Sequence, residues 1–131
     1  MKEVNVVAAL FFREGRFFIA RRPENRARGL LWEFVGGKTE PGETDADALA
    51  RECREELDAE VRVGELYMSL RHEYPDLTVR LSVYRAELLT PPRMCEHCGF
   101  AWILPEEIGQ YPFCPADREV LEKIVSEKTV E

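Results

Sequence analysis

The chain has 131 residues, a length that fits one domain with a single hydrophobic core. Its 45% hydrophobic and 33% charged residues are typical of a soluble protein, and its formal net charge of −7 argues against generic binding to a nucleic-acid backbone. The longest apolar run, Val6 to Phe12, is too short to span a bilayer, and the first residues lack a signal peptide pattern. We expect one domain, residues 1–131, in the cytoplasm, with neither a membrane nor a nucleic-acid polymer as partner.

The N-terminal part of the chain predicts a β-hairpin. Val4 to Phe12 and Phe17 to Arg21 are rich in Val, Phe and Ala, and the polar stretch 13–16 between them is a turn signal. The polar stretch Pro23 to Gly29 follows without periodicity, and we expect a mobile loop that can cover a ligand. Four arginines surround this loop in an otherwise acidic chain, which indicates either attraction for phosphate or simply solvated side chains: Arg21, Arg22, Arg26 and Arg28.

A helix is predicted from Thr44 to Leu57, a segment free of glycine and proline. Thr44 followed three residues later by Asp47 fits a capping box, with an acidic side chain near the positive end of the helix dipole. Helical spacing predicts an apolar face made of Ala46, Leu49, Cys53 and Leu57.

Three carboxylates gather beside that face, at Glu52, Glu55 and Glu56. Like charges at helical spacing repel, so the cluster is tolerated either because water screens it or because a cation neutralises it. The spacing by itself does not decide between a solvated face and a metal site.

The rest of the chain alternates strands with short helical segments. We expect either one strand or a strand pair interrupted at Gly64 over 60–63 and 66–71, a turn at Pro75-Asp76 and a half-buried strand over 78–87. A short strand over 100–104, a helical turn at Pro105 and a helix over 116–126 follow, with Val120, Leu121, Ile124 and Val125 as the apolar face of that helix. We expect the last five residues, 127–131, to be frayed. This order predicts an α/β protein with a mixed β-sheet between helices.

The stretch from Gly37 to Ala59 resembles the Nudix box. The box is a glycine, five residues, a glutamate, seven residues, Arg-Glu, an apolar residue, any residue, Glu-Glu, any residue, glycine and an apolar residue. Every charged position matches, and only Asp58 and Ala59 depart from the pattern, in place of glycine and a larger apolar residue. Asp is one of the least costly substitutes for a left-handed glycine at the end of a helix, so we expect the fold to survive. The matching residues are Gly37, Glu43, Arg51, Glu52, Cys53, Glu55 and Glu56.

The resemblance implies the α/β/α sandwich of the Nudix family and a divalent-metal site. Hard carboxylate oxygens suit Mg²⁺, with Mn²⁺ as the alternative. In the family, the metal is held by the glutamates that match Glu52, Glu55 and Glu56 and by a backbone carbonyl that matches Gly36 or Gly37. Arg51 would orient these carboxylates, and Glu43 would support it.

Resemblance to the MutT-like branch extends through 31–34 and 111–117 and implies hydrolysis of a nucleoside triphosphate to the monophosphate and pyrophosphate. By this likeness Arg22 lies near the substrate phosphates, and Phe34 and Asp117 bind the nucleotide. Glu96, twenty-one positions before Asp117, matches a further metal ligand or base, unless it is an ordinary loop glutamate.

The identity of the base depends on the protonation state of Asp117. An ionised Asp accepts from two guanine donors, which favours 8-oxo-dGTP, whereas a protonated Asp donates to cytosine N3 and favours CTP or a modified dCTP. Asp117 is also placed to act as a helix N-cap instead.

Two other functional classes are open to the sequence. A non-catalytic nucleotide sensor is disfavoured by the complete set of box glutamates. A zinc or redox protein built on Cys95 and Cys98 is disfavoured because a single close pair lacks two further clustered ligands, so free thiols are the expectation for all four cysteines. We expect a monomer or a homodimer.

Overall fold

The computed structural model describes residues 2–130, so Met1 and Glu131, the ends of the expected domain, lie outside the described residues. Within that range the chain forms a seven-stranded sheet, two α-helices and two 3₁₀ turns. The strands are β1 (Glu3–Arg13), β2 (Arg16–Arg21), β3 (Trp32–Glu33), β4 (Gly36–Lys38), β5 (Val61–Glu73), β6 (Thr78–Leu88) and β7 (Gly99–Ile103). The helices are α1 (Asp45–Leu57) and α2 (Arg118–Val130), and the 3₁₀ turns are η1 (Pro105–Gln110) and η2 (Pro115–Asp117).

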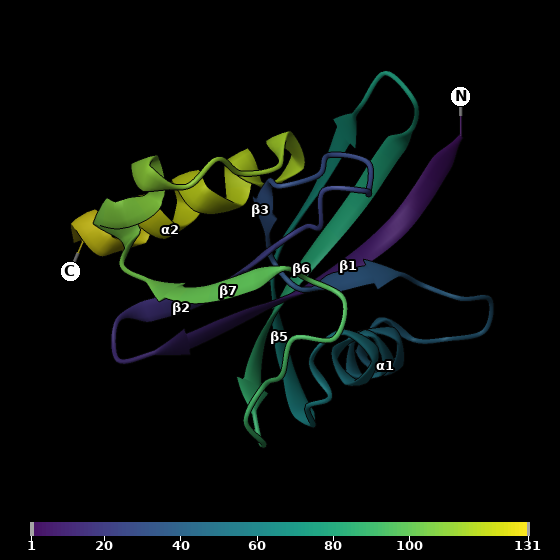
Figure 1. Ribbon diagram of the computed structural model, residues 1–131, viewed down its shortest axis with the longest axis horizontal. Helices are drawn as coiled ribbons and strands as arrows, with labels where there is room; N and C mark the ends of the chain where they lie inside the picture. The colour runs from purple at the N-terminus through teal and green to yellow at the C-terminus, as the bar shows by residue number, and fades with distance from the viewer. Residues whose placement is uncertain (1, 131) are drawn as a thin grey trace.

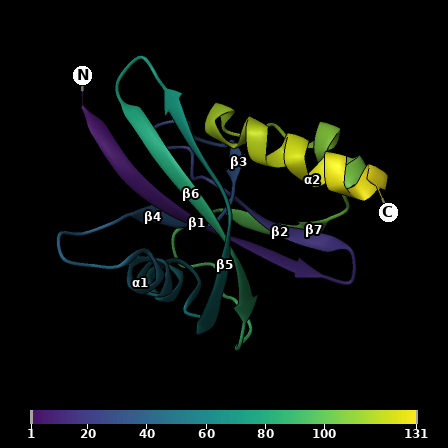
Figure 2. The ribbon, with the colours of Figure 1, turned by 180° about the vertical axis from the view of Figure 1, so that it is seen from behind.

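The sheet is mixed, as the sequence predicts. Its strand order is β3-β2-β1-β6-β5, with β4 paired to β1 and β7 paired to β2. The pairing of β1 with β6 is parallel, whereas the other strand pairs are antiparallel. The two helices lie on opposite sides of the sheet (Figures 1 and 2), which confirms the α/β/α arrangement.

The longest apolar run of the chain, Val6 to Phe12, lies in strand β1, whose two faces are both covered. Ala8 and Leu10 face the core under α2, together with Val120. Val7 and Ala9 face the core under α1, together with Leu49 and Cys53 of that helix. A strand that is covered on both faces is apolar at every position instead of alternating.

The predicted N-terminal hairpin is confirmed. Phe12 pairs with Phe17 and Arg13 with Arg16, so a two-residue turn joins β1 to β2. Both turn residues, Glu14 and Gly15, have positive φ, at 52° and 79°. A turn of this kind has the twist that a tight hairpin requires.

Helix α1 begins directly after the predicted Thr44, which is its N-cap, and ends at the predicted Leu57, but its buried face differs in part. The Thr44 side chain accepts a hydrogen bond from the Asp47 amide at 3.1 Å, and Asp58 ends the helix in the left-handed conformation at φ 50°. Ala46 is exposed, contrary to the prediction, because the first turn contacts the sheet through its neighbour Asp45, whose carboxylate accepts a hydrogen bond from Tyr84 of β6. Ala48 is fully buried and takes its place in the core, beside Leu49, Cys53 and Leu57.

The stretch around Gly64 forms one strand, the first of the two predicted alternatives, because β5 continues through Gly64 and absorbs the irregularity as register shifts between Val63 and Met68 against β6. The prediction for the last helix needs correction. In α2, Val120, Leu121 and Ile124 are buried as predicted, but Val125 is 44% exposed. The helix also continues to Val130 instead of fraying from residue 127, and residue 131 of that prediction lies outside the described residues.

Among residues 2–130, no helix combines the length and the apolar composition that crossing a bilayer requires.

Gly36 lets β4 lie directly against β1. A Cβ atom at this position would be 1.9 Å from the Val7 carbonyl oxygen, and that oxygen belongs to the backbone of a central strand. We expect Gly36→Ala to lower the free energy of unfolding by about 3 kcal/mol, because the strands must separate to admit the methyl group. Urea unfolding measures this change, with Gly109→Ala as the control, since a Cβ at Gly109 meets no atom within 4 Å. Equal stability of the two variants would contradict the expected clash.

Candidate active site

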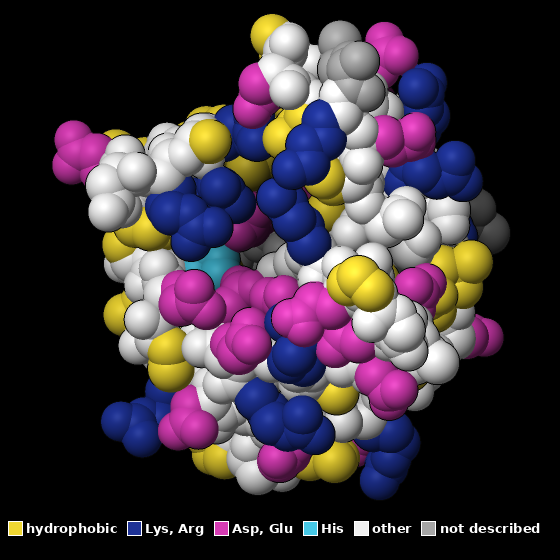
Figure 3. Space-filling view, turned by 90° about the vertical axis from the view of Figure 1, so that its right-hand side faces the viewer, with side chains coloured by type: hydrophobic (Ala, Val, Ile, Leu, Met, Phe, Trp, Pro, Cys, Tyr) yellow, Lys and Arg dark blue, Asp and Glu magenta, His cyan; other side chains and the backbone are white. Residues whose placement is uncertain are grey.

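A cavity of about 490 Å³ lies beside α1 and β4 and reaches the loop at 22–28 and the turn η2. Figure 3 shows a hollow with acidic side chains along one border, basic side chains along the opposite border and a histidine at its edge. Nine of the eleven sequence-predicted site residues line this cavity: Arg22, Phe34, Gly36, Gly37, Glu52, Glu55, Glu56, Glu96 and Asp117. The other two, Glu43 and Arg51, lie behind the carboxylates of α1.

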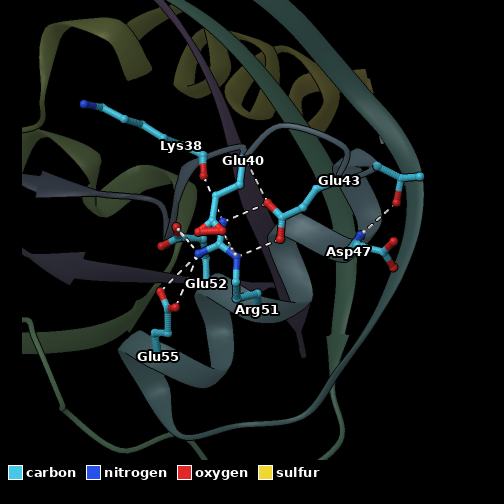
Figure 4. Close-up of polar contacts among 8 residues, drawn as sticks. Lys38, Glu40, Glu43, Asp47, Arg51, Glu52 and Glu55 are labelled. Carbon is cyan, nitrogen blue, oxygen red and sulfur yellow. Dashed lines mark hydrogen bonds and ion pairs between the residues drawn. The ribbon is translucent and has the colours of Figure 1, made fainter.

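Arg51 is the centre of an ion-pair network that joins α1 to the loop before it (Figure 4). Its Nε and Nη2 atoms donate to the two carboxylate oxygens of Glu43 at 2.7 and 2.9 Å. Its Nη1 atom donates to Glu52 Oε1 at 2.9 Å and to Glu55 Oε2 at 3.2 Å. The Lys38 carbonyl accepts the remaining Nη2 bond at 3.0 Å.

This network fixes the charge states of its central pair. The hydrogen bonds from Arg51 hold the pKa of Glu43 below its ordinary value, with a smaller contribution from the Glu40 amide. The hydrogen bonds to Glu43 in turn raise the pKa of Arg51 above its ordinary value. The ionised pair therefore orients the Glu52 and Glu55 carboxylates at the cavity wall.

We expect Arg51→Lys to lower kcat about 10- to 100-fold with a smaller change in KM, the range seen when groups that orient metal ligands are replaced. An ammonium group lacks the planar fork that holds Glu43 and Glu52 at once. The matched control is Arg54→Lys on the same helix, whose exposed pair with Glu60 at 3.0 Å does not face the cavity. Steady-state kinetics of both variants test this, and equal kcat values would contradict the orienting role.

Gly37 brings the backbone into contact with a predicted metal ligand. A Cβ atom at this position would be 2.4 Å from the Glu52 carboxylate, so a side chain there would displace Glu52. Gly36 and Gly37 lie in strand β4 and pair with Ala8 and Val7. The glycines therefore hold a backbone segment, a row of carboxylates and the cavity within a few ångströms of one another.

Glu56 is the buried carboxylate of the site. It is only 7% exposed, whereas the side chain of Glu55 is 51% exposed. Burial raises the pKa of Glu56 well above its ordinary value, and the neighbouring Glu52, Glu33 and Glu96 carboxylates raise it further. Burial and the neighbouring carboxylates therefore disfavour a negative charge on Glu56 by itself. A cation bound beside the Glu56 carboxylate would compensate this charge.

Glu96 and His97 reach the cavity from the connection that precedes β7. Glu96 is exposed at the rim, yet close enough to act on Glu56 electrostatically. His97, which was not predicted as a site residue, has a side chain that is 5% exposed, and its Nε2 atom lies 2.9 Å from Glu33 Oε2. Glu33 was also missed as a site residue. Both could have been found from the sequence, Glu33 as one acidic residue within the apolar stretch 30–35 and His97 as the neighbour of Glu96.

The arginines around the 22–29 loop have different environments. Arg22, Arg26 and Arg28 line the cavity, whereas Arg21 does not. Arg22 donates to Glu33 Oε1 at 3.0 Å and to the Ala27 carbonyl at 2.8 Å, so its guanidinium is held at the cavity wall. Arg28 pairs with Asp76 at 3.3 Å. The cavity therefore has a basic wall that faces its carboxylates. That Arg22 binds the substrate phosphates stays a prediction.

Phe34 and Asp117 form the part of the cavity that is far from solvent. Phe34 is 3% exposed and packs against Phe17 and Phe113, so it belongs to the core as well as to the cavity wall. Asp117 is 6% exposed at the end of η2, directly before the first residue of α2. Burial raises the pKa of Asp117 well above its ordinary value; Glu33 adds to this effect and Arg22 opposes it.

The donor set fits a hard divalent cation. Carboxylates from α1 and from the connection before β7 meet the backbone of β4 at one wall of the cavity, and oxygen is the ligand that Mg²⁺ and Mn²⁺ prefer. The observation that supports this fit is the buried Glu56 carboxylate, whose pKa burial raises and the neighbouring Glu52 raises further.

Comparison with known proteins gives the family. The model of the NUDIX domain matches residues 6–123. The chain is 39% identical over 127 residues to the CTP pyrophosphohydrolase of Escherichia coli (strain K12), with 96% of this chain and 94% of the relative covered. It is 32% identical over 126 residues to the 8-oxo-dGTP diphosphatase of the same organism, with 95% and 98% covered.

A solved structure gives the same result for the fold. The MutT protein from Methanosarcina mazei Go1 superimposes with a TM-score of 0.85 and is 27% identical, with 97% of this chain and 96% of that chain covered. The matched range includes both glycines of β4, every carboxylate of the cavity and Asp117. From its sequence and from its fold, the chain belongs to the Nudix family of hydrolases.

Proposed function

We propose that the protein is a Mg²⁺-dependent nucleoside triphosphate pyrophosphohydrolase, with Mn²⁺ as an alternative ion, that converts its substrate and water into the nucleoside monophosphate and pyrophosphate. The observation that carries this proposal is the cavity with carboxylates on one wall and arginines on the other. Such a cavity suits a polyphosphate that is bound partly through a metal and partly through guanidinium groups. The names of the two enzymes compared above support the same class of substrate.

The residues divide between metal binding and positioning. Glu52, Glu55, Glu56 and Glu96 would hold the cation, together with the carbonyl of Gly36 or Gly37. The bound cation supplies neutralisation of phosphate oxygens and a lowered pKa for an attacking water. Arg51 and Glu43 keep the ligands in place, and Arg22 would contact the phosphates. If Glu96 does not bind metal, its position at the rim suits a base that accepts the proton of the water.

The buried end of the cavity would hold the base, with Phe34 against the ring and Asp117 at the hydrogen-bonding edge. An ionised Asp117 would read the donors of an oxidised guanine, as in 8-oxo-dGTP. The burial of Asp117 beside Glu33 favours its protonated form, and a protonated carboxyl group donates to cytosine N3 while it accepts from the N4 amino group. This observation favours CTP or a modified dCTP over the 8-oxo-dGTP that the sequence placed first.

The remaining expectations stay proposals. We propose that residues 1–131 act as a single domain in the cytoplasm, as a monomer or a homodimer, without a nucleic-acid polymer as partner.

A nucleotide screen tests the proposed function. Canonical and oxidised nucleoside triphosphates are incubated with the protein and Mg²⁺, and the products are identified by chromatography. We expect monophosphate and pyrophosphate, with no turnover after chelation of the metal. Diphosphate and inorganic phosphate as products would contradict the proposed bond cleavage. Nucleotide binding without turnover would identify a non-catalytic sensor instead.

A further inference from the structure

Glu33, Glu56 and His97 form a cluster that the pyrophosphohydrolase proposal leaves only partly used. One ligand atom from each of these side chains lies within 4.8 Å of the other two. His97 Nε2 is 2.9 Å from Glu33 Oε2 and 3.5 Å from Glu56 Oε1. The three side chains come from β3, α1 and the connection before β7, and they are 19%, 9% and 5% exposed. Three separate elements therefore converge on one buried point.

The cluster is held in place by groups around it. Arg22 binds Glu33 Oε1 at 3.0 Å, which leaves the other oxygen, Oε2, directed at His97. The segment that carries His97 is tied at both ends, because the Cys95 amide donates to the Glu56 carbonyl and the Cys98 amide donates to the Arg21 carbonyl. Such outer hydrogen bonds orient metal ligands in known sites.

The imidazole of His97 has polar partners on one side only. Its Nδ1 atom is buried and makes no hydrogen bond within residues 2–130, so Nε2 and the two carboxylates form its whole polar environment. Two carboxyl groups lie next to one imidazole, and within residues 2–130 the cation that pairs with them is Arg22, which binds Glu33 and not Glu56. A divalent cation between Glu33, Glu56 and His97 would balance the charge at the place where the three donors meet.

The nitrogen donor determines which cation suits the cluster. Imidazole is a preferred ligand for Zn²⁺ and Co²⁺, whereas Mg²⁺ prefers oxygen ligands only. Neighbouring ligands of a tetrahedral ion with bonds near 2.1 Å stand about 3.4 Å apart. The distances of 2.9 and 3.5 Å from Nε2 bracket that value.

We propose that Glu33 Oε2, Glu56 Oε1 and His97 Nε2 form a binding site for a divalent transition-metal ion of the Zn²⁺ or Co²⁺ type. The site shares Glu56 with the Mg²⁺ ligands, so an ion of this type and Mg²⁺ bind to overlapping but different donor sets. His97 is the residue that distinguishes them, because it adds nitrogen to one set and not to the other.

The test measures metal binding instead of turnover, so it stands apart from the proposed hydrolase activity. Co²⁺ and Mg²⁺ are titrated separately by calorimetry, and Co²⁺ also by visible absorption, into a Cys95→Ser/Cys98→Ser parent that removes the two exposed thiols as competing ligands. His97→Gln is expected to weaken Co²⁺ binding at least about tenfold, since loss of a supporting group already costs 10- to 100-fold. Mg²⁺ affinity should change much less. His72→Gln is the matched control, because the second of the two histidines packs against Tyr74 at 4.6 Å.

Two further measurements keep the result unambiguous. Glu33→Gln should also weaken Co²⁺ binding, and pulsed EPR of bound Mn²⁺ or Co²⁺ should detect coupling to an imidazole nitrogen that is lost in His97→Gln. Circular dichroism and thermal unfolding establish that each variant is folded. Co²⁺ affinity that is the same in the parent and in folded His97→Gln, or a metal signal without nitrogen coupling, would overturn the proposed site.

Discussion

Replacing Glu56 with glutamine is expected to lower kcat at least about a hundredfold, an increase of roughly 2.7 kcal/mol in the activation free energy. A neutral amide is a poor ligand for a hard divalent cation, and Glu56 is the most buried carboxylate of the cluster on α1. The substitution removes the charge but keeps the shape of the side chain, so a loss of activity can be assigned to metal binding.

The stability of the same variant provides an internal check of folding. Because the pKa of folded Glu56 is raised above its ordinary value, the contribution of Glu56 to stability is present at low pH and is lost as the pH rises toward the folded pKa. Without metal, Glu56→Gln should therefore be at least as stable as the parent at alkaline pH. Thermal unfolding in EDTA measures this.

Glu60→Gln is the matched control for Glu56→Gln, since Glu60 is exposed, pairs with Arg54 and lies outside the cavity. Glu60→Gln should retain the kcat of the parent. Near-normal turnover by folded Glu56→Gln would remove the basis for the proposed metal site.

Asp117→Ala is expected to abolish the preference between bases, with a loss of kcat/KM on the preferred nucleotide of roughly ten- to a hundredfold. The physical reason is that an unpaired polar group in a buried pocket costs about 1–3 kcal/mol. Comparison of CTP with 8-oxo-dGTP in parent and variant measures the effect. A variant that keeps the preference of the parent would show that Asp117 does not contact the base.

The pH dependence of the preference identifies the form of Asp117 that reads the base. With the pKa of Asp117 raised, the protonated donor is present at low pH and is lost as the pH rises through the folded pKa. The ratio of kcat/KM for CTP to that for 8-oxo-dGTP should then fall as the pH rises through the folded pKa of Asp117. Taking the ratio cancels the titration of groups that serve both substrates.

Asp117→Asn is the control for this pH series, because an amide donates and accepts without titrating. Its ratio should not change with pH. A parent ratio that favours 8-oxo-dGTP throughout, or that rises with pH, would show that ionised Asp117 reads guanine donors.

Local patterns in the sequence were sufficient for helix α1 and for the order of elements. The caps at Thr44 and Asp58 are local features, and the charged residues of α1 lie together because helical spacing alone places them on one side. The tight turn at Glu14 and Gly15 was likewise predictable, since a hairpin depends on a few neighbouring residues.

Partners that are distant in the chain could not be predicted from spacing. The contact of His97 with Glu33 spans 64 positions, and it exists only because β3 and the connection before β7 meet at one end of the cavity. The burial of Asp117 has the same origin, since the residue would be an exposed helix start if the sheet did not lie over η2.

The sequence by itself determined the family, the mixed sheet and the box carboxylates, because these depend on short-range spacing and on the alternation of apolar residues. The tertiary structure alone decided which of those carboxylates is buried, that Glu33 and His97 join them, and that the environment of Asp117 favours a proton. The physical reason is that burial and electrostatic interaction depend on distance in space, and this distance is set by the packing of elements that are far apart in the chain.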